Sequence, residues 1–362
     1  MRDGWIRPSG IFHKSDVLTN RVMRFEGGEI ARIASLDEVP ADAEIVQLEG
    51  ILSPGFVDLQ VNGGGGVQLN NTPTQEGVLA IARAHRASGT AMTLPTVITD
   101  KTEVTRRAAE AVLACKGLEG VAGIHIEGPH INPARKGTHD PALIRPLDDE
   151  TFNLVSMLRT HKLPVMITLA PELAEPGQIA ALTRMGAIVS AGHSDATADQ
   201  IEMAFGEGLA AFTHLFNGMR QMTGREPGVV GAALASDAYC GIILDGHHVD
   251  DRMSRIAFSS RISSGKMFLV SDAMATWNGP GSFELYGETI RVEQGRLVNR
   301  EGSLAGAHID MSGCVIHALE IGLKKEEALI SAITAPAALM GLGIEPAHTL
   351  GQRAGDVLLM SN

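Results

Sequence analysis

Short apolar runs alternate with longer polar-faced stretches through most of this chain. The apolar runs, rich in Val, Ile, Leu, Ala and Met, lie at residues 91–97, 123–127, 165–169, 187–191, 210–214, 241–244 and 267–270. The stretches between them have helical length, as at residues 75–88, 101–115, 149–160 and 250–260. This βαβα alternation is typical of a parallel sheet covered by helices. With residues 55–61 as the first strand the count reaches eight, the number that closes a (β/α)8 barrel.

The two ends of the chain show a different pattern. Residues 21–25 and 29–33 flank Gly27-Gly28 as a β-hairpin, and residues 44–48 form a third short strand. Residues 354–360 make one more isolated strand at the other end. A sheet this small is not stable alone. We therefore expect the last strand to join the first three.

The predicted fold is α/β, a (β/α)8 TIM-like barrel with a small β-sandwich domain formed from both termini. The small domain takes residues 1–52 and 346–362, and the barrel takes residues 53–345 with a β-hairpin insertion near 283–300. Residues 311–323 and 325–339 read as closing helices. A doubly wound sheet would usually carry a G-x-G-x-x-G fingerprint after its first strand, and Gly63-Gly-Gly-Gly66 does not fit it.

Composition narrows the class of protein further. The 362 residues are 44% hydrophobic, which suffices for a sizeable core, and no segment approaches the ~18 consecutive apolar residues of a membrane span. A formal net charge of −12 without a long block of Lys or Arg argues against nucleic acid or an anionic membrane surface as partner. The three cysteines, Cys115, Cys240 and Cys314, are odd in number and widely separated, as reduced thiols are. We expect a cytoplasmic protein with neither nucleic acid nor membrane as partner.

Metal-ligand residue types stand at the ends of several predicted strands. Glu127 ends one run, His193 and His214 end two others, and Asp272 ends a fourth. The C-terminal ends of barrel strands converge on one mouth, where functional groups collect. A single histidine at such a place can equally be structural, but one Glu and two His together fill three positions of a catalytic metal site and leave one for water. The pattern predicts a metal-dependent hydrolase.

Motifs of one known family occur in order through the barrel region. They are Pro54-Gly-Phe-Val-Asp-Leu-Gln-Val-Asn-Gly, His125-Ile-Glu-Gly-Pro-His, Lys136-Gly-Thr-His-Asp, Ala191-Gly-His-Ser-Asp-Ala, Thr213-His-Leu-Phe-Asn-Gly-Met-Arg, Asp245-Gly-His-His-Val-Asp and Val270-Ser-Asp-Ala-Met. Together they resemble the N-acetylglucosamine-6-phosphate deacetylase family of the amidohydrolase superfamily. The resemblance runs nearly from end to end, and the superfamily fold it implies agrees with the barrel predicted above.

The resemblance implies an activity and a set of catalytic residues. The activity is metal-dependent hydrolysis of the acetamide of N-acetyl-D-glucosamine 6-phosphate to glucosamine 6-phosphate and acetate, in amino-sugar catabolism. Glu127, His193 and His214 would bind one divalent metal ion per chain, usually Zn²⁺ in this family. Asp272 would be the general acid/base, and His139 would help to stabilise the oxyanion.

Substrate contacts are implied in the same way, together with a homodimer. Arg225 and His248 match the family's phosphate ligands, and an Arg suits bidentate contacts to phosphate oxygens. The remaining implied contacts to the phosphorylated N-acetylhexosamine are Thr138, His139, Asn217, Gly218, Leu304, Ala305 and Gly306.

Alternatives remain within the enzyme class and outside it. A deacetylase for N-acetylgalactosamine 6-phosphate would differ only in hydroxyl recognition, which the sequence does not resolve. A cyclic-amide hydrolase usually has two metal ions bridged by a modified lysine, and no lysine ends a barrel strand here. Where many amidohydrolases carry His-x-His, this chain has Gln60-Val-Asn62, and neutral amides are weak zinc ligands, so we expect a single metal ion. A metal-free sugar-phosphate sensor would have lost Asp272.

Overall fold

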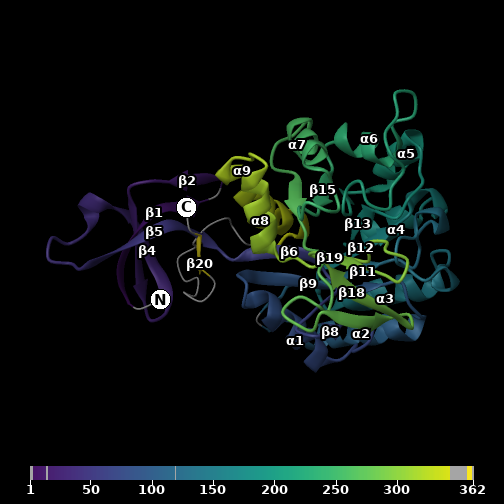
Figure 1. The fold of residues 1–362 in the computed structure, drawn as a ribbon, viewed down its shortest axis with the longest axis horizontal. Coiled ribbons are helices and arrows are strands. Elements are labelled where there is room, and N and C mark those ends of the chain that lie inside the picture. Colours follow the sequence, from purple (N-terminus) through teal and green to yellow (C-terminus); the bar gives the residue numbers. More distant parts are fainter. Residues whose placement is uncertain (1–2, 14, 119, 343–356, 361–362) are drawn as a thin grey trace.

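The computed structural model describes residues 3–13, 15–118, 120–342 and 357–360. Strands from both ends of the chain share one six-stranded sheet, drawn as the lobe at the left of Figure 1. The order is β20-β5-β1-β3-β4, and β2 pairs with β1. Their bounds are β1 Gly4–His13, β2 Asp16–Leu18, β3 Arg21–Glu26, β4 Glu29–Ser35, β5 Ile45–Pro54 and β20 Val357–Met360.

Apolar side chains lie on both faces of this sheet, because successive residues of a strand point to opposite sides. Ile11, Phe25 and Leu52 belong to one cluster, and Trp5 and Val22 belong to the other. The long strand β5 leads directly toward the barrel. The proposed domain boundaries remain predictions, and the one at residues 345 and 346 lies outside the described residues.

Eight parallel strands form a nearly closed barrel, which confirms the predicted fold class. They follow one another in the order β6 Phe56–Val61, β9 Thr90–Ile98, β11 Ile124–Glu127, β12 Val165–Leu169, β13 Ile188–Ala191, β14 Ala211–Phe212, β15 Tyr239–Ile242 and β16 Met267–Leu269. A short strand, β10 Gly120–Val121, pairs alongside β9. The first and last strands meet through a bridge between Val61 and Ala273 and a hydrogen bond from Asp272 N to Gln60 O of 3.0 Å.

Helices cover the outside of the barrel (Figure 1). Several begin at side-chain caps, such as Thr74, Asp148 and Thr197, each accepting a backbone N–H from the first turn. The α-helices are α1 Gln75–Arg86, α2 Thr102–Ala114, α3 Asp149–Thr160, α4 Gln178–Arg184, α5 Ala198–Glu207, α6 Gly228–Leu234, α7 Asp251–Ser259, α8 Met311–Glu320, α9 Lys325–Leu329 and α10 Ala335–Met340. Short 3₁₀ turns lie at Leu36–Glu38, Pro133–Arg135, Pro141–Leu143 and Pro171–Leu173. No helix in the described part of the chain is long and apolar enough to cross a membrane.

One predicted helix is not continuous. Residues 325–339 were expected to be a single helix, but a π-helical turn at Ile330–Thr334 separates α9 from α10. Pro336 stands at the start of α10 and has no N–H to offer to the preceding turn. The π turn changes the hydrogen-bonding register just before the proline, as local bulges do.

A small antiparallel sheet stands against the mouth of the barrel. It consists of β17 Ser282–Leu285, β18 Glu288–Glu293 and β19 Arg296–Val298. These strands lie where a β-hairpin insertion was expected, near residues 283–300. A shorter hairpin of β7 Gly63–Gly64 and β8 Val67–Gln68 follows β6. Leu285, Ile290 and Leu297 of the larger sheet pack with Ile98, the last residue of β9, and with Met274, which follows β16. The insertion therefore forms one wall of the mouth.

Candidate active site

Four candidate residues lie at the C-terminal ends of barrel strands. Glu127 is the last residue of β11, and His193 and His214 follow β13 and β14 by two residues each. Asp272 follows β16 by three residues. All four are at least nine-tenths buried. The barrel thus brings together side chains that are up to 145 residues apart in the sequence, between positions 127 and 272.

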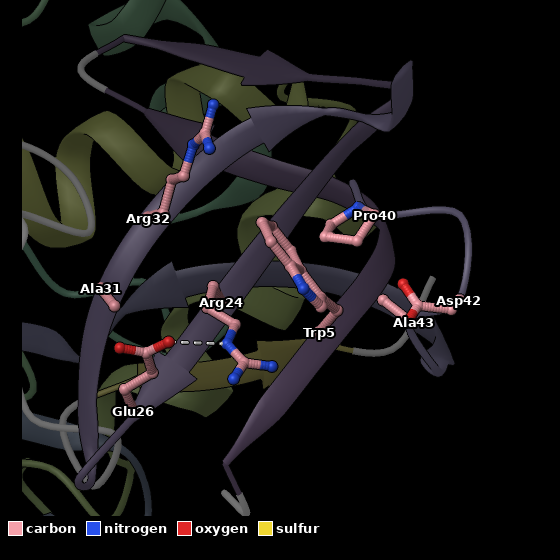
Figure 2. Close-up of a pocket in the computed structure, with 8 residues that line it drawn as sticks. All are labelled: Trp5, Arg24, Glu26, Ala31, Arg32, Pro40, Asp42 and Ala43. Atoms are coloured by element: carbon pink, nitrogen blue, oxygen red, sulfur yellow. Dashed lines mark hydrogen bonds and ion pairs between the residues drawn. The ribbon is translucent and has the colours of Figure 1, made fainter. Parts of the chain in front are cut away.

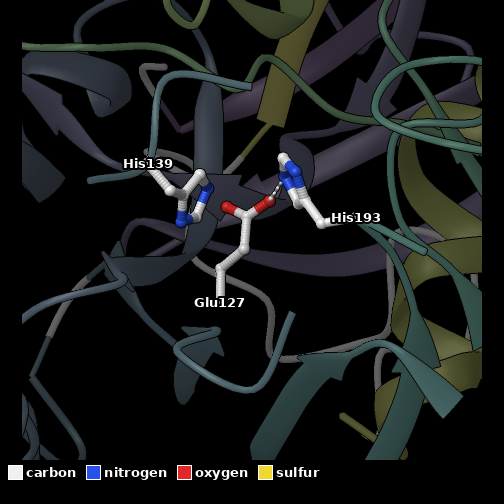
Figure 3. Close-up of side chains that lie close together, drawn as sticks. All are labelled: Glu127, His139 and His193. Carbon is white, nitrogen blue, oxygen red and sulfur yellow. Dashed lines mark hydrogen bonds and ion pairs between the residues drawn. The ribbon is translucent and has the colours of Figure 1, made fainter. Parts of the chain in front are cut away.

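Three of these side chains converge on one point. Glu127 Oε1 lies 3.1 Å from His193 Nε2 and 2.9 Å from His214 Nε2, and the two imidazole nitrogens are 3.1 Å apart. Ligand atoms of Glu127, His139 and His193 also lie within 4.8 Å of one another. Figure 3 shows the Glu127 carboxylate between the rings of His139 and His193.

The hydrogen-bond partner of His193 Nδ1 determines which ring nitrogen of His193 carries the proton. His193 Nδ1 is 2.8 Å from Arg135 O. A carbonyl oxygen only accepts, so Nδ1 carries a proton and, in the neutral ring, Nε2 presents a lone pair. A backbone carbonyl behind a ligating imidazole is a common arrangement in metal sites. Glu127 Oε1, His193 Nε2 and His214 Nε2 thus form a donor set of the type that divalent transition metals prefer.

The charges of the cluster favour a cation at this point. Burial alone would raise the pKa of Glu127, but the neighbouring His193 and His214 outweigh burial and hold the pKa well below its ordinary value. Burial alone would lower the pKa of His214, but the Glu127 carboxylate raises it above its ordinary value. A buried carboxylate that holds positive charge on its neighbours would also favour a divalent ion.

Two side-chain amides from β6 and the residue after its end hold the second carboxylate. Gln60 Nε2 donates to Asp272 Oδ1 and to Glu127 Oε2, each at 3.0 Å. Asn62 Nδ2 donates to the same Asp272 Oδ1 at 2.7 Å. Because Oδ1 accepts two N–H groups, a proton on this carboxyl belongs on Oδ2. Burial, followed by the charge of Glu127, raises the pKa of Asp272 to about 6, so this group can exchange a proton near neutral pH.

The backbone is strained at the same positions. His193, His214 and Asp272 have φ values of 48°, 32° and 49°, in the left-handed region that L-residues other than Gly rarely adopt. Such conformations persist where the surrounding structure imposes them, and they are frequent at active sites. Here each one turns a side chain into the mouth directly after its strand.

His139 approaches the cluster from the long loop between β11 and α3. Its ring is buried, and the ring centroid lies 4.4 Å from that of His193. Burial, with the charge of His193 next, lowers the pKa of His139 to about 3, so the ring is neutral. The neighbouring Thr138 is half-buried. The structure therefore places His139 beside the predicted metal ligands.

The predicted substrate contacts are placed less uniformly. His248 is almost fully buried, and its Nδ1 lies 2.7 Å from Asp245 Oδ2. Burial and the charge of Glu127 raise the pKa of Asp272, and the charge of His248 acts in the opposite direction. Asn217 Nδ2 donates to His214 O at 3.3 Å. Arg225, in contrast, is exposed on the loop between β14 and α6, and the structure does not bring it into the cluster.

The remaining predicted contacts lie in the connections that follow β14 and β19. Gly218 has φ of 58°, and a Cβ there would lie 2.9 Å from His193 Nδ1, so glycine allows a close approach. Leu304 and Ala305 pair with the end of β19, and Gly306 lies against Met274.

Sequence reasoning missed two features of the site. Gln60 and Asn62 were considered only as poor metal ligands, whereas they donate hydrogen bonds to both carboxylates. Thr99, just beyond β9, was not considered at all, yet its Oγ1 lies 2.6 Å from His139 Nδ1. Their positions at strand ends were the available signal.

A separate hollow of about 570 Å³ lies on the small sheet (Figure 2). Trp5 forms its floor, with Arg24 at 5.8 Å from the ring centroid and ion-paired to Glu26 at 3.0 Å. Arg32 is paired with Glu38. The basic groups of this hollow are already neutralised, and none of its residues belongs to the cluster.

Known proteins resemble this chain over most of its length. The amidohydrolase family model matches residues 51–345. An N-acetylgalactosamine-6-phosphate deacetylase of Shewanella sp. is 42% identical over 80% of this chain and 74% of its own length. An N-acetylglucosamine-6-phosphate deacetylase of Haemophilus influenzae is 32% identical over 92% of this chain and 88% of its own. The crystal structure of N-acetylglucosamine-6-phosphate deacetylase from Pasteurella multocida superposes with a TM-score of 0.90 at 31% identity, covering 100% of this chain and 96% of that one.

Proposed function

The chain belongs to the amidohydrolase family, and from that premise we propose that it hydrolyses the acetamide of N-acetyl-D-glucosamine 6-phosphate to glucosamine 6-phosphate and acetate. The observation that carries the proposal is the convergence of Glu127, His193 and His214 beside Asp272, at the barrel end where amidohydrolase chemistry requires them. Relatives with the deacetylase name in bacteria and mammals support the substrate class.

Glu127, His193 and His214 would hold one divalent ion, which we propose to be Zn²⁺. When bound, such an ion supplies a Lewis acid and makes water more acidic. One Glu and two His leave a coordination position open, as catalytic zinc sites do. Arg135 O would fix the tautomer of His193, and Gln60 would orient the carboxylate of Glu127.

Asp272 would carry the proton through both halves of the reaction. Its Oδ2 takes a proton from the attacking water and then delivers it to the departing amine. Gln60 and Asn62 keep Oδ1 occupied, so one oxygen does both transfers. His139 would donate a hydrogen bond to the carbonyl oxygen as negative charge develops there.

The phosphate and the sugar would be bound around the mouth. We propose Arg225 and His248 as phosphate ligands, and Thr138, Asn217, Gly218, Leu304, Ala305 and Gly306 as further substrate contacts. The exposed position of Arg225 means that it must reach the site from a loop. In a protein with a formal net charge of −12, local cations of this kind are needed to hold an anionic substrate.

N-acetylgalactosamine 6-phosphate is the second candidate substrate, because one relative with 42% identity is named a deacetylase of that sugar. Release of free amine should be measured for both 6-phosphates and for the two unphosphorylated sugars. We expect turnover of N-acetylglucosamine 6-phosphate, with loss on metal removal and recovery on adding Zn²⁺. Activity on neither 6-phosphate, in protein with bound metal, would overturn the proposal.

We also propose a cytoplasmic homodimer that acts in amino-sugar metabolism. A sugar phosphate carries charge and does not cross a lipid bilayer unaided, which supports action inside the cell. Ile256 on α7 and Ile316 on α8 are 44% and 55% exposed, and a subunit contact would cover such side chains. Sedimentation equilibrium of the purified protein would test the dimer.

A further inference from the structure

Thr99 stands behind the imidazole of His139. It follows the last residue of β9 and is fully buried. Its Oγ1 lies 2.6 Å from His139 Nδ1. Among the described residues, no other hydrogen bond involves this hydroxyl.

The direction of this hydrogen bond follows from counting protons. A buried hydroxyl hydrogen needs an acceptor, and the acceptor within reach of Thr99 is His139 Nδ1. If Nδ1 carried a proton, the hydroxyl could only accept, and its hydrogen would be buried without a partner. That applies to the Nδ1–H tautomer and to the doubly protonated ring alike. An unpaired buried polar hydrogen costs roughly 1–3 kcal/mol, so the neutral ring with its proton on Nε2 is favoured.

We propose that Thr99 is a positioning residue that fixes the Nε2–H tautomer of His139, and thereby makes this histidine a hydrogen-bond donor to the substrate rather than a metal ligand. The inference rests on the proposed function for its catalytic consequence. A ligating nitrogen must present a lone pair, whereas a group that stabilises a carbonyl oxygen must present a hydrogen. Thr99 selects the second of these roles.

His193 shows the opposite arrangement in the same cluster. Its Nδ1 faces the carbonyl oxygen of Arg135 at 2.8 Å, which can only accept a hydrogen. The proton is therefore held on Nδ1, and Nε2 of the neutral ring is free to bind a metal. Two histidines with rings 4.4 Å apart are thus given different chemistry by the groups behind them.

The threonine cannot easily move away from the ring. A Cβ on Gly128 would lie 2.3 Å from Thr99 Oγ1, so the hydroxyl is pressed against the residue that follows Glu127. Tyr286, at the β17–β18 turn of the hairpin sheet, donates its hydroxyl hydrogen to Thr99 O. The insertion at the mouth and Gly128, just after β11, thus hold Thr99 from two sides.

The test compares three variants of the metal-loaded enzyme. Thr99→Val keeps the shape and removes the hydroxyl, and Thr99→Ser keeps the hydroxyl. Thr90→Val is the matched control, because Thr90 is buried at the other end of β9 and its hydroxyl has no partner among the described residues. We expect Thr99→Val to lower kcat by about 10-fold to 10²-fold, with KM, metal content and melting temperature close to those of wild type. Thr99→Ser and Thr90→Val should stay within a few-fold of wild type.

A spectroscopic measurement reads the tautomer without any turnover. The protein is labelled with ¹⁵N at histidine, and the His139 signals are identified by their loss in His139→Gln. We expect the wild type and Thr99→Ser to show a protonated Nε2 and an unprotonated Nδ1, and Thr99→Val to show a mixture. A proton on His139 Nδ1 in the wild type would overturn the inference, as would unchanged kcat in Thr99→Val. If the proposed substrate is wrong, only the kinetic comparison is lost, and the spectrum still decides the tautomer.

Discussion

At the scale of single residues, the two carboxylates of the site each divide their oxygens between two tasks. Glu127 Oε1 faces the histidines while Oε2 accepts from Gln60. Asp272 Oδ1 accepts from Gln60 and Asn62, which leaves Oδ2 for proton transfer. The amides thus determine which oxygen does the chemistry, although they are too weak as ligands to hold zinc themselves.

Asp272→Asn should abolish turnover while leaving fold and metal content intact. The amide keeps the shape but cannot carry the proton, and loss of a positioned acid/base lowers kcat by ~10²-fold or more. The measurement is kcat with melting temperature and metal analysis on the same sample. Asp237→Asn, which removes an ion-paired acid outside the mouth, serves as the control. Near-normal kcat in Asp272→Asn would mean that another group transfers the proton.

Arg225→Ala should raise KM for the phosphorylated substrate and barely affect the unphosphorylated sugar. A charge-assisted hydrogen bond contributes about 1.5–3 kcal/mol, which corresponds to roughly 10-fold to 10²-fold in KM. Steady-state kinetics on both sugars give the comparison, and Arg107→Ala on the exposed face of α2 is the matched control. Equal effects on the two sugars would rule out a phosphate contact.

The sequence was sufficient to point to Glu127, His193, His214 and Asp272, because each stands at the end of an apolar run. It did not reveal the roles of Gln60 and Thr99. Those roles depend on which atoms face one another in the folded protein. Gln60 and Glu127 are 67 residues apart in the sequence, and Thr99 and His139 are 40 apart. Hydrogen-bond direction is a property of the assembled mouth, and no local pattern encodes it.

At the scale of elements, strongly periodic segments were predicted well and interrupted ones were not. The barrel strands and the helices at 75–86 and 149–160 follow clear apolar patterns. Strand β1 was missed because Pro8 and Gly10 break its pattern, although both are tolerated in this strand, where the register shifts between them. Strand β5 was predicted to end at residue 48 because Glu49-Gly50 breaks the apolar pattern there, whereas the strand continues to Pro54.

Tyr286→Phe tests whether the hairpin sheet supports the site. The tyrosine hydroxyl donates to Thr99 O, and removing one buried hydrogen bond should lower the free energy of unfolding by about 1–2 kcal/mol. We expect kcat to fall less than in Thr99→Val, because the threonine hydroxyl remains. Denaturant unfolding and kcat are measured together, with Tyr239→Phe on β15 as the control. Full retention of both quantities would show that the insertion does not brace Thr99.

At the scale of the whole molecule, one metal ion per chain should be enough for full activity. A second ion would need ligands at the end of β6, where Gln60 and Asn62 supply neutral amides that already donate hydrogen bonds to carboxylates. Elemental analysis after dialysis, with stepwise addition of Zn²⁺ to metal-free protein, measures the stoichiometry. Activity that continues to rise up to a second equivalent would contradict the single-metal site.

Stability should fall with rising pH because of one buried acid. Asp58 is fully buried on β6, and burial raises its pKa to about 7. The unfolded chain releases this proton near pH 4, so the folded protein binds more protons between about pH 4 and 7. The stability contributed by the protonated carboxyl is complete below pH 4 and is lost as the pH rises through 7.

Asp58→Asn should remove this dependence, since asparagine resembles the protonated acid. Between pH 5 and 8 the wild type should lose roughly 3 kcal/mol more unfolding free energy than the variant, because about two pH units of this window lie below the folded pKa and each contributes 1.36 kcal/mol. Denaturation midpoints at several pH values give the comparison, and Asp16→Asn, an exposed acid on β2, is the control. Parallel curves for Asp58→Asn and wild type would refute the assignment.

The left-handed backbone at His193, His214 and Asp272 implies a trade-off between thermal stability and catalysis. Each such conformation costs an L-residue roughly 1–2 kcal/mol, and glycine would relieve that cost while deleting the functional group. Laboratory evolution for thermal survival alone would therefore favour losing these three side chains. Variants recovered from such a selection should be more thermostable and catalytically inactive. A thermostable enzyme that keeps its activity must therefore gain stability from substitutions elsewhere in the chain.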